Sequence, residues 1–487
     1  MTVQDTSKDH KKHTKRAQAS NKHSFGNSGR SMMTQELPKY EMPQNSTDPA
    51  SVYQIIHDEL ALDCNPTLNL ATFVTNWMDK EANQLLLETA PKNYADMSCY
   101  TQTLEIEERC VSILADLWNA PEKNSHSTGT YCVGSSEACL LGALAMKKTW
   151  QQRRKAANKD HYHPNIVMSS TVQVVWKKFA AYWDVEPRYA IISEHKFDGN
   201  NDELIKLCDE NTIGVISLLG STYTGHFDDV QDLNTKLNAL NKAKGWEIGI
   251  HVDAATGGFI APFLYPDLKW DFRLNNVLSI NASGHKYGLT YPGSGWIVWR
   301  DHLQLPEELV FDLHYLGGTE KTYTLNFSKP ASQAILQYYN FLRLGRDGYT
   351  RVIQDCRDNA DYLTTRIEKL GIFDIVSSAT GTPLVTAKLK DSVTEFTVFD
   401  LEHKLKEYGW IVPAYQLAEG AEHLFILRMV VREAFSADLA AKLVEALKES
   451  IAHLSKAANE STTTKKKNVE SVKKAKKTRN AKMHIPC

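Results

Sequence analysis

Residues 250–258 read Ile-His-Val-Asp-Ala-Ala-Thr-Gly-Gly, a short apolar strand that ends in an acid and is followed by small residues. In parallel sheets covered by helices, ligands bind at the carboxyl ends of the strands, where Asp253 would lie. An acid at the end of a strand can also cap a helix or bind a metal ion. The segment therefore indicates a parallel sheet and makes Asp253 a candidate site residue without fixing its role.

Strand-like runs and helical stretches alternate on both sides of this segment, from about residue 130 to residue 300. Several runs are apolar on successive residues, as expected when helices cover both faces of a sheet. The alternation favours βαβ units and an α/β fold with a mainly parallel sheet. The predicted strands are Asn165–Ser169, Arg188–Ile192, Ile213–Leu219, Glu247–Val252, Val277–Asn281 and Trp296–Trp299.

A helix is predicted over Ser136–Trp150, after a strand-like run at 131–133 and a turn at Gly134. Its first turn would offer backbone N–H groups and the hydroxyls of Ser135 and Ser136 to an anion. Simple N-capping by the same serines is the alternative explanation.

After Gly348 the pattern changes to helix, strand, helix, strand and helix, which predicts a smaller α+β domain that ends near Leu454. Ser436 is the expected N-cap of the last helix. The leucine and isoleucine stripe of that helix has i, i+4 spacing and predicts core packing. Its members are Leu439, Leu443, Leu447 and Ile451.

The chain has 487 residues, 42% hydrophobic and 23% charged, which suits a folded protein of two or three domains. We expect no membrane span, because no apolar run approaches about 18 residues, and no secretory signal in the first 30 residues. Eight cysteines without a Cys-x-x-Cys spacing predict neither a zinc site nor a disulfide framework. Reduced thiols in the cytoplasm are the resulting expectation.

Both ends of the chain are basic, although the formal net charge is only -2. Residues 1–30 carry seven Lys or Arg against two Asp or Glu, and residues 456–487 carry ten against two. Neither end has enough apolar surface to offset its ordering entropy. We therefore expect disordered basic tails at 1–35 and 456–487.

A second motif follows the strand after Asp253 and reads Ser283-Gly284-His285-Lys286-Tyr287-Gly288. A His-Lys pair alone is typical of a solvated surface, but neighbouring strand ends would bring Lys286 and Asp253 to one edge of the sheet. A lysine whose pKa is lowered by desolvation or a nearby cation can form a Schiff base with an aldehyde. An acid beneath a pyridine ring can keep the ring nitrogen protonated and make the ring an electron sink.

Several motifs in one order resemble those of the group II pyridoxal-phosphate-dependent decarboxylase family, and within it the glutamate decarboxylases. The resemblance covers most of residues 60–455. It is carried by Glu108-Arg109-Cys110-Val111, Gly134-Ser135-Ser136-Glu137-Ala138-Cys139, His251-Val252-Asp253-Ala254-Ala255, Ala282-Ser283-Gly284-His285-Lys286, Tyr315-Leu316-Gly317-Gly318, Asn326-Phe327-Ser328 and Phe341-Leu342-Arg343-Leu344-Gly345-Arg346.

The resemblance implies a PLP-dependent transferase fold of the aspartate aminotransferase type, fold type I. A large domain at 69–350 would hold pyridoxal 5'-phosphate on a mostly parallel seven-stranded sheet, with a helical segment at 36–68 before it and a small C-terminal α+β domain at 351–455. It also implies a homo-oligomer whose active sites lie at the dimer interface. The implied reaction converts L-glutamate to 4-aminobutyrate and CO2 through a Schiff base and a quinonoid carbanion.

The resemblance also implies roles for individual residues around the cofactor. Lys286 would form the Schiff base and Asp253 would bind the pyridine nitrogen. Gln at position 173, where many wider relatives carry His, is typical of the glutamate branch. The phosphate would be bound by Ser135, Ser136 and His285, and by Ser328 from the neighbouring subunit. Ala255 and Gln173 would lie on the two faces of the ring. Thr222 would lie near the reacting end, although a Thr in such a turn often only bonds the local backbone.

Substrate recognition is implied by three further segments. Thr72 and Phe73 resemble the loop that meets the side-chain carboxylate. Asn93 and Asp96 resemble residues that a partner subunit lends to that pocket, and Arg428 resembles the arginine that grips the α-carboxylate. A guanidinium suits that role because it binds a carboxylate at two points, whereas an ion pair at the surface is the plain alternative. Asp96 beside an anionic substrate favours acid conditions, in which one carboxyl group carries a proton.

Other readings remain open at this level. An aminotransferase or a C–C lyase would use a similar Lys and Asp, aspartate could replace glutamate, and a binding relative with an inactive site would keep the fold. Plant relatives carry a C-terminal calmodulin-binding extension. Here, calmodulin is a weakly supported partner, because the basic tail has no Trp and only Val469 and Val472 as apolar anchors in its charged stretch.

Overall fold

The computed structural model describes residues 39–122, 127–313 and 320–481, with side chains up to residue 460. The chain divides into two units, residues 1–65 and residues 66–487. The described part of the first unit holds one helix, α3 (Pro49–Leu60), which begins where the Asp48 carboxylate accepts the Ser51 N–H at 3.0 Å. No helix in the described ranges is long and apolar enough to cross a membrane.

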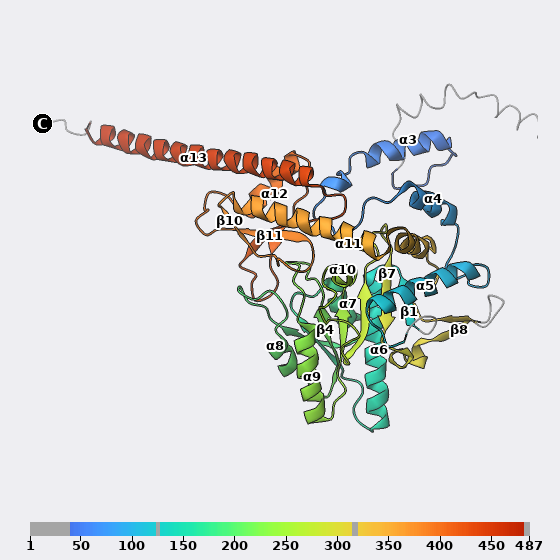
Figure 1. Ribbon diagram of the computed structural model, residues 1–487. Helices are drawn as coiled ribbons and strands as arrows, with labels where there is room; N and C mark the ends of the chain where they lie inside the picture. Colours follow the sequence, from blue (N-terminus) through green and yellow to red (C-terminus); the bar gives the residue numbers. More distant parts are fainter. Residues whose placement is uncertain (1–38, 123–126, 314–319, 482–487) are drawn as a thin grey trace, which may run out of the picture. The chain divides into compact units, whose positions relative to one another are not determined.

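The second unit is built on a seven-stranded sheet of order β1-β7-β6-β5-β4-β2-β3 (Figure 1). Strands β2 to β6 run parallel to their neighbours within that group, whereas β7 is antiparallel to both β6 and β1. This confirms the mostly parallel seven-stranded sheet and the fold class. The strands are β1 (Thr128–Cys132), β2 (Asn165–Ser169), β3 (Glu186–Ala190), β4 (Thr212–Leu218), β5 (Gly249–Asp253), β6 (Val277–Ala282) and β7 (Gly295–Trp299).

Both faces of the sheet are buried, because successive residues of β2 enter different apolar clusters. Val167 packs into one cluster, and Ile166 and Met168 pack into another. Helix α6 contacts β4, β5, β6 and β7, which makes it the central helix of its face. The helices of this region are α4 (Lys80–Thr89), α5 (Thr101–Leu117), α6 (Ser135–Ala156), α7 (Val174–Tyr182), α8 (Asn201–Lys206), α9 (Val230–Lys244) and α10 (Ala261–Leu264).

All six predicted strands are present, with ends that move by one or two residues. The strand expected at Glu247 begins at Gly249 instead. The side chain and carbonyl of Glu247 both bind Arg153, at 2.6 and 2.9 Å, which keeps this residue outside the ladder. The strand expected to end at Ile192 ends at Ala190.

The small domain is a four-stranded antiparallel sheet of order β10-β11-β13-β12, covered by helices. It contains two more strands than the sequence pattern indicates, because β10 and β12 are only three residues long. Its elements are β10 (Phe373–Ile375), β11 (Leu384–Leu389), α12 (Val398–Glu407), β12 (Ala414–Gln416), β13 (Phe425–Val430) and α13 (Ala437–Ala481).

The domain boundary expected at residue 350 does not coincide with a linker. Helix α11 (Ser332–Glu368) runs through it, and its one break is at Gly345, which has a φ of 58°. Glycine is the residue that adopts this conformation without a side-chain clash. A short hairpin of β8 (Phe311–Leu313) and β9 (Glu320–Thr322) precedes α11.

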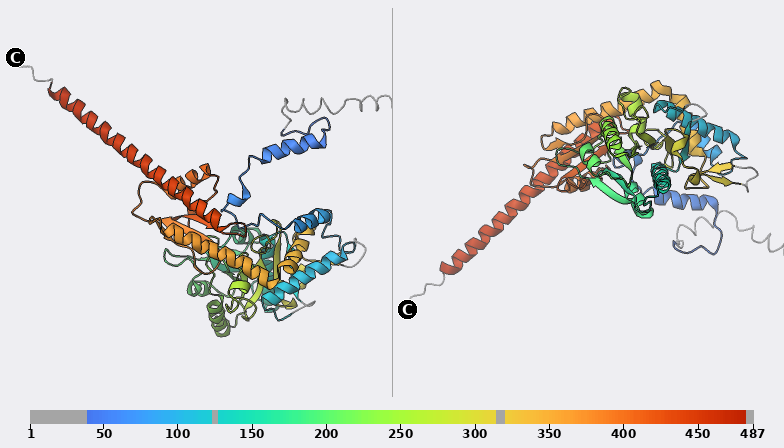
Figure 2. Two further views of the ribbon diagram at one scale, coloured as in Figure 1. Left: turned by 45° about the horizontal axis from the view of Figure 1, so that its top comes forward. Right: turned by 90° about the horizontal axis from the view of Figure 1, so that it is seen from below.

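Helix α13 continues through most of the segment expected to be a disordered tail from residue 456. Figure 2 shows it as one unbroken helix, which ends at Ala481. The correction has a physical reason, because residues 437–481 contain no Gly or Pro and are rich in the helix formers Ala, Lys and Glu. Leu443 and Leu447 are buried, which confirms the predicted core stripe of its first part.

Candidate active site

Asp253 lies at the carboxyl end of β5, where the adjacent strands place Leu218 and Asn281 beside it. Its carboxylate is 6% exposed and accepts three hydrogen bonds. Trp176 Nε1 donates to Oδ2 at 2.8 Å, while Asn281 Nδ2 and the Ala255 N–H donate to Oδ1 at 3.1 and 3.2 Å. These three donors fix the orientation of the carboxylate.

Lys286 lies in the turn that follows β6, and Thr75 holds that turn from another part of the chain. The Thr75 hydroxyl donates to the Lys286 carbonyl at 2.8 Å, and the Thr75 N–H donates to the His285 carbonyl at 2.8 Å. Burial lowers the pKa of the Lys286 amine and the Arg428 charge adds to this, while Asp253 acts in the opposite direction. A lysine with a lowered pKa is a ready nucleophile for an aldehyde.

The first turn of α6 forms the opposite end of the same site. Gly134 precedes it with a φ of 84°, and a Cβ there would lie 3.3 Å from His285 Cε1. Ser135 Oγ lies 2.5 Å from Ser283 Oγ. The free N–H groups at this helix start suit a phosphate.

His285 faces this helix start as a neutral ring. Its Nδ1 accepts the Ser294 N–H at 3.2 Å, which leaves Nε2 as the protonated nitrogen and a hydrogen-bond donor. Burial, with a smaller contribution from Lys286, lowers the pKa of His285 to about 4. The ring therefore offers a donor rather than a charge to an anion.

These groups line one cavity of about 280 Å³. It has the size and the donor set for a phosphorylated pyridine aldehyde: an amine and an acid at one end, and hydroxyls with a helix start at the other. The cavity contains all the cofactor residues predicted from one chain, namely Ser135, Ser136, Gln173, Thr222, Asp253, Ala255, His285 and Lys286.

Arg428 comes from β13 of the small domain and lies beside this cavity rather than in its lining. It donates to the carbonyls of Thr222 and Ala71 at 2.7 and 2.5 Å. The guanidinium carbon lies 5.0 Å from the centre of the Phe73 ring, and Lys286 Nζ lies 5.2 Å from the same centre. Phe73 and Arg428 thus lie at the amine end of the site. Thr72 precedes Phe73 in the chain.

Ser328, Asn93 and Asp96 do not line the cavity. Ser328 is exposed, and its hydroxyl accepts a hydrogen bond from Asn93 Nδ2 at 3.3 Å. The backbone of Asp96 donates to the Asn93 carbonyl at 3.2 Å, so the three residues form a separate surface cluster. The motif at residues 315–318 lies outside the described residues. All other motifs of the resemblance lie within them.

Four residues of the site were not predicted individually. Trp176 and Asn281 hold Asp253, Ser283 bonds Ser135, and Cys139 lines the cavity beside Asp253. Ser283 and Cys139 stand inside quoted motifs, so the motifs contained a signal for them. Trp176 carried none, because its contact with Asp253 spans 77 positions of the chain.

The fold and this site together define an enzyme of fold type I that binds pyridoxal phosphate. Residues 38–390 match the pyridoxal-dependent decarboxylase conserved domain. The chain is 50% identical to a glutamate decarboxylase of Solanum lycopersicum over 86% of this chain and 83% of the relative. The chain belongs to the pyridoxal-dependent decarboxylase family and is a pyridoxal-phosphate-dependent carboxy-lyase.

Bacterial relatives and a solved structure agree with this assignment. Glutamate decarboxylase beta of Listeria innocua is 45% identical over 88% of this chain and 93% of the relative. The structure of a Lactobacillus brevis glutamate decarboxylase superposes with a TM-score of 0.83 at 44% identity, covering 86% of this chain and 96% of that chain.

Proposed function

We propose that this enzyme decarboxylates L-glutamate to 4-aminobutyrate and CO2. The observation that carries the proposal is that Lys286 and Arg428 both lie about 5 Å from the centre of the Phe73 ring, which places a cation that could bind a carboxylate in the same region as the amine. The plant and bacterial relatives named above are glutamate decarboxylases at 45–50% identity.

Pyridoxal phosphate, when bound, supplies an aldehyde and a ring that withdraws electrons from the bonds at Cα. Lys286 would attach it and later accept it back. Asp253 would hold the proton on the pyridine nitrogen, so that negative charge from the broken bond spreads into the ring. His285 Nε2 and the hydroxyls of Ser135 and Ser136 would bind the phosphate.

Arg428 would determine which bond at Cα breaks. By gripping the α-carboxylate at two points, it would hold the bond between that carboxylate and Cα perpendicular to the ring plane. Only a perpendicular bond overlaps the π system, so orientation selects loss of CO2 over loss of a proton. After CO2 has left, the protonated amine of Lys286 would deliver the proton that completes the product.

The surface cluster of Ser328, Asn93 and Asp96 supports a second proposal about assembly. Its residues lie outside the cavity of their own chain, as expected if they complete the site of a second copy, with Ser328 on the phosphate and Asn93 and Asp96 on the side-chain carboxylate. We propose a homodimer with shared sites, in which Thr72 and Phe73 form the same chain's part of the side-chain pocket.

A panel of amino acids tests the reaction. The cofactor-loaded enzyme is incubated with each one while CO2 and products are measured, with the Lys286→Ala variant as control. We expect CO2 and 4-aminobutyrate from glutamate and no turnover by the variant. Keto acids without CO2 would indicate an aminotransferase, a faster reaction with aspartate would reassign the substrate, and no product with any amino acid would indicate an inactive relative.

Mixing two inactive variants tests the shared sites. In a dimer of Lys286→Ala with Asn93→Ala/Ser328→Ala, one site would receive all its residues, so the mixture should recover activity that neither parent has. Unchanged inactivity after verified subunit exchange would contradict shared sites. A cytoplasmic location, a preference for acid conditions and calmodulin as a partner of the basic C-terminus remain predictions from the sequence.

A further inference from the structure

A continuous hydrogen-bonded row runs from Asp253 along one face of the sheet, between β5 and β6. Asn281 Nδ2 donates to Asp253 Oδ1 at 3.1 Å, and Asn281 Oδ1 lies 2.8 Å from His251 Nε2. His251 Nδ1 lies 2.7 Å from the hydroxyl of Ser279. His251 and Asn281 are 0% exposed and Ser279 is 1% exposed, so solvent does not compete for these bonds.

The chemistry of the row fixes every proton in it. A carboxylate only accepts, so Asn281 must present its NH2 group to Asp253 and its carbonyl to His251. His251 must therefore carry its proton on Nε2, and Nδ1 must accept from the Ser279 hydroxyl. Burial lowers the pKa of His251, which agrees with this neutral form.

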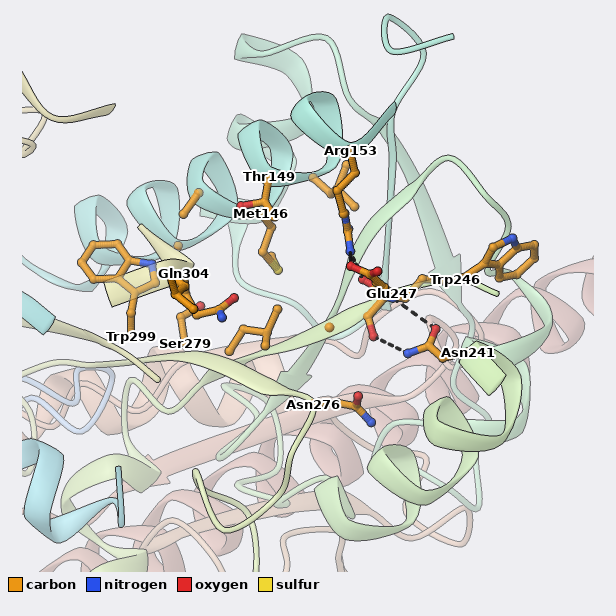
Figure 3. A pocket seen from close by; sticks show the side chains of 17 residues that line it. Met146, Thr149, Arg153, Asn241, Trp246, Glu247, Asn276, Ser279, Trp299 and Gln304 are labelled. Atoms are coloured by element: carbon orange, nitrogen blue, oxygen red, sulfur yellow. Dashed lines mark hydrogen bonds and ion pairs between the residues drawn. The ribbon is translucent and has the colours of Figure 1, made fainter. Parts of the chain in front are cut away.

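The row ends at a second cavity, which lies at the opposite end of the same strands. Gly249 lines this cavity of about 350 Å³ and Asp253 lines the first one, although both belong to β5. Ser279 and Met146 are also part of its wall, and Figure 3 shows both side chains there. The described contacts thus connect the wall of this cavity, through three side chains, to the acid of the cofactor site.

We propose that His251 is a positioning residue for the cofactor, which acts by locking the Asn281 amide so that Asp253 keeps its donor and its orientation. Without the His251 N–H, the buried Asn281 carbonyl would lose its donor, and the amide would be held only at its bond to Asp253. The inference rests on the proposed role of Asp253 toward the pyridine nitrogen, but not on the identity of the substrate.

Three substitutions separate this role from simple packing. His251→Leu fills much of the space but removes both ring nitrogens, whereas His251→Gln can still donate to Asn281 and accept from Ser279. Gly142→Ala keeps every polar group but would place a Cβ 2.6 Å from His251 Cε1 and Nδ1, which displaces the ring. Met146→Leu is the matched control, because it lines the same second cavity and is not part of the row.

The readouts are cofactor release into buffer, the pH dependence of the bound cofactor's visible absorbance, and kcat and KM separately. The titratable groups that face Asp253 are Lys286, Cys139 from α6 and His251, so the absorbance profile is compared among variants that keep the first two. We expect His251→Leu to release cofactor about tenfold faster, the change that corresponds to about 1.4 kcal/mol. Its kcat should fall with KM little changed, Gly142→Ala should change in the same direction, and His251→Gln should recover most of the loss.

Wild-type release and absorbance in a folded His251→Leu protein would overturn the proposal, and so would an equal effect of Met146→Leu. If His251→Leu does not fold, Ser279→Ala decides, because it removes the hydroxyl at His251 Nδ1 and leaves the bond from Nε2 to Asn281 in place. Nitrogen-15 NMR of the histidine ring in the cofactor-free protein should then show a shifted Nδ1 signal with Nε2 still protonated, and an unchanged ring signal would refute the row. The Asp253→Asn variant tests separately the proposed role of Asp253 toward the pyridine nitrogen. If this variant changes neither cofactor release nor absorbance, that role is wrong, and the hydrogen-bonded row itself is not contradicted.

Discussion

Replacing Arg428 by Lys tests the most consequential contact of the proposed reaction. Arg428 is 7% exposed, donates through both terminal nitrogens to carbonyls, and its Nε has no partner among the described residues. A lysine keeps the positive charge but offers one point of contact instead of a planar pair. The variant should therefore bind the α-carboxylate in more than one orientation.

The magnitude follows from the loss of one charge-assisted hydrogen bond, which is worth about 1.5–3 kcal/mol. This predicts that kcat/KM for glutamate falls by about 10- to 150-fold. The assay is initial-rate CO2 release over a range of glutamate concentrations, together with a thermal unfolding curve. Because orientation is lost as well as affinity, we expect kcat to fall along with the rise in KM.

Arg432 provides a matched control four residues further along the chain. It is 3% exposed and donates only to backbone carbonyls of residues 66, 69 and 74, away from the cavity. Arg432→Lys should lower thermal stability by removing a charge-assisted hydrogen bond, at a cost of about 1.5–3 kcal/mol, with kcat/KM nearly unchanged. Equal losses of kcat/KM in the two variants, or none in Arg428→Lys, would refute the assignment of the carboxylate site.

Three further predictions concern the cofactor end of the site. Lys286→Ala should abolish turnover and the visible absorbance of the lysine-bound cofactor, and retention of both in a spectrum and a rate assay would contradict its role. The pKa of His285 is lowered from 6.5 to about 4, so the unfolded chain takes up a proton at a higher pH than the folded chain does. The stability that this ring contributes to the cofactor-free protein is therefore fully present above pH 6.5 and is lost as the pH falls toward 4. Between those pH values the melting temperature of His285→Gln should depend less steeply on pH than that of the wild type, and an identical dependence would refute the shift. Gly134→Ala forces a side chain to adopt a φ of 84°, at a cost of about 1–3 kcal/mol, and should weaken cofactor binding by about tenfold or more in an equilibrium titration, whereas unchanged affinity would show that this turn tolerates a side chain.

The sequence was sufficient for those parts of the site that depend on local pattern. Asp253 ends the apolar strand β5 and Lys286 lies in the turn that follows β6, so the strand prediction itself places them at one edge of the sheet. Ser135 was predictable for the same reason, since a helix must begin after the Gly134 turn. The strands of the large sheet were recognisable because burial on both faces leaves long apolar runs.

Contacts between distant segments could not be predicted in this way. Arg428 reaches the Thr222 carbonyl across 206 positions, and no local pattern in either segment requires the other. The strands β10 and β12 are too short for periodicity to reveal them. The part of the last helix beyond residue 456 was missed because high charge suggested disorder, although Ala, Lys and Glu favour helix whenever a packed first part provides the nucleus.

The shared contact of Lys286 and Arg428 with Phe73 has a consequence for the timing of proton movement. The Arg428 charge is one of the influences that lower the pKa of Lys286. A carboxylate bound to Arg428 would cancel that influence and let the amine take up a proton, and departure of the same carboxylate as neutral CO2 would restore it. Lys286 would then become the stronger acid at the moment when Cα needs a proton, so the leaving group itself would act as the trigger for the step that follows.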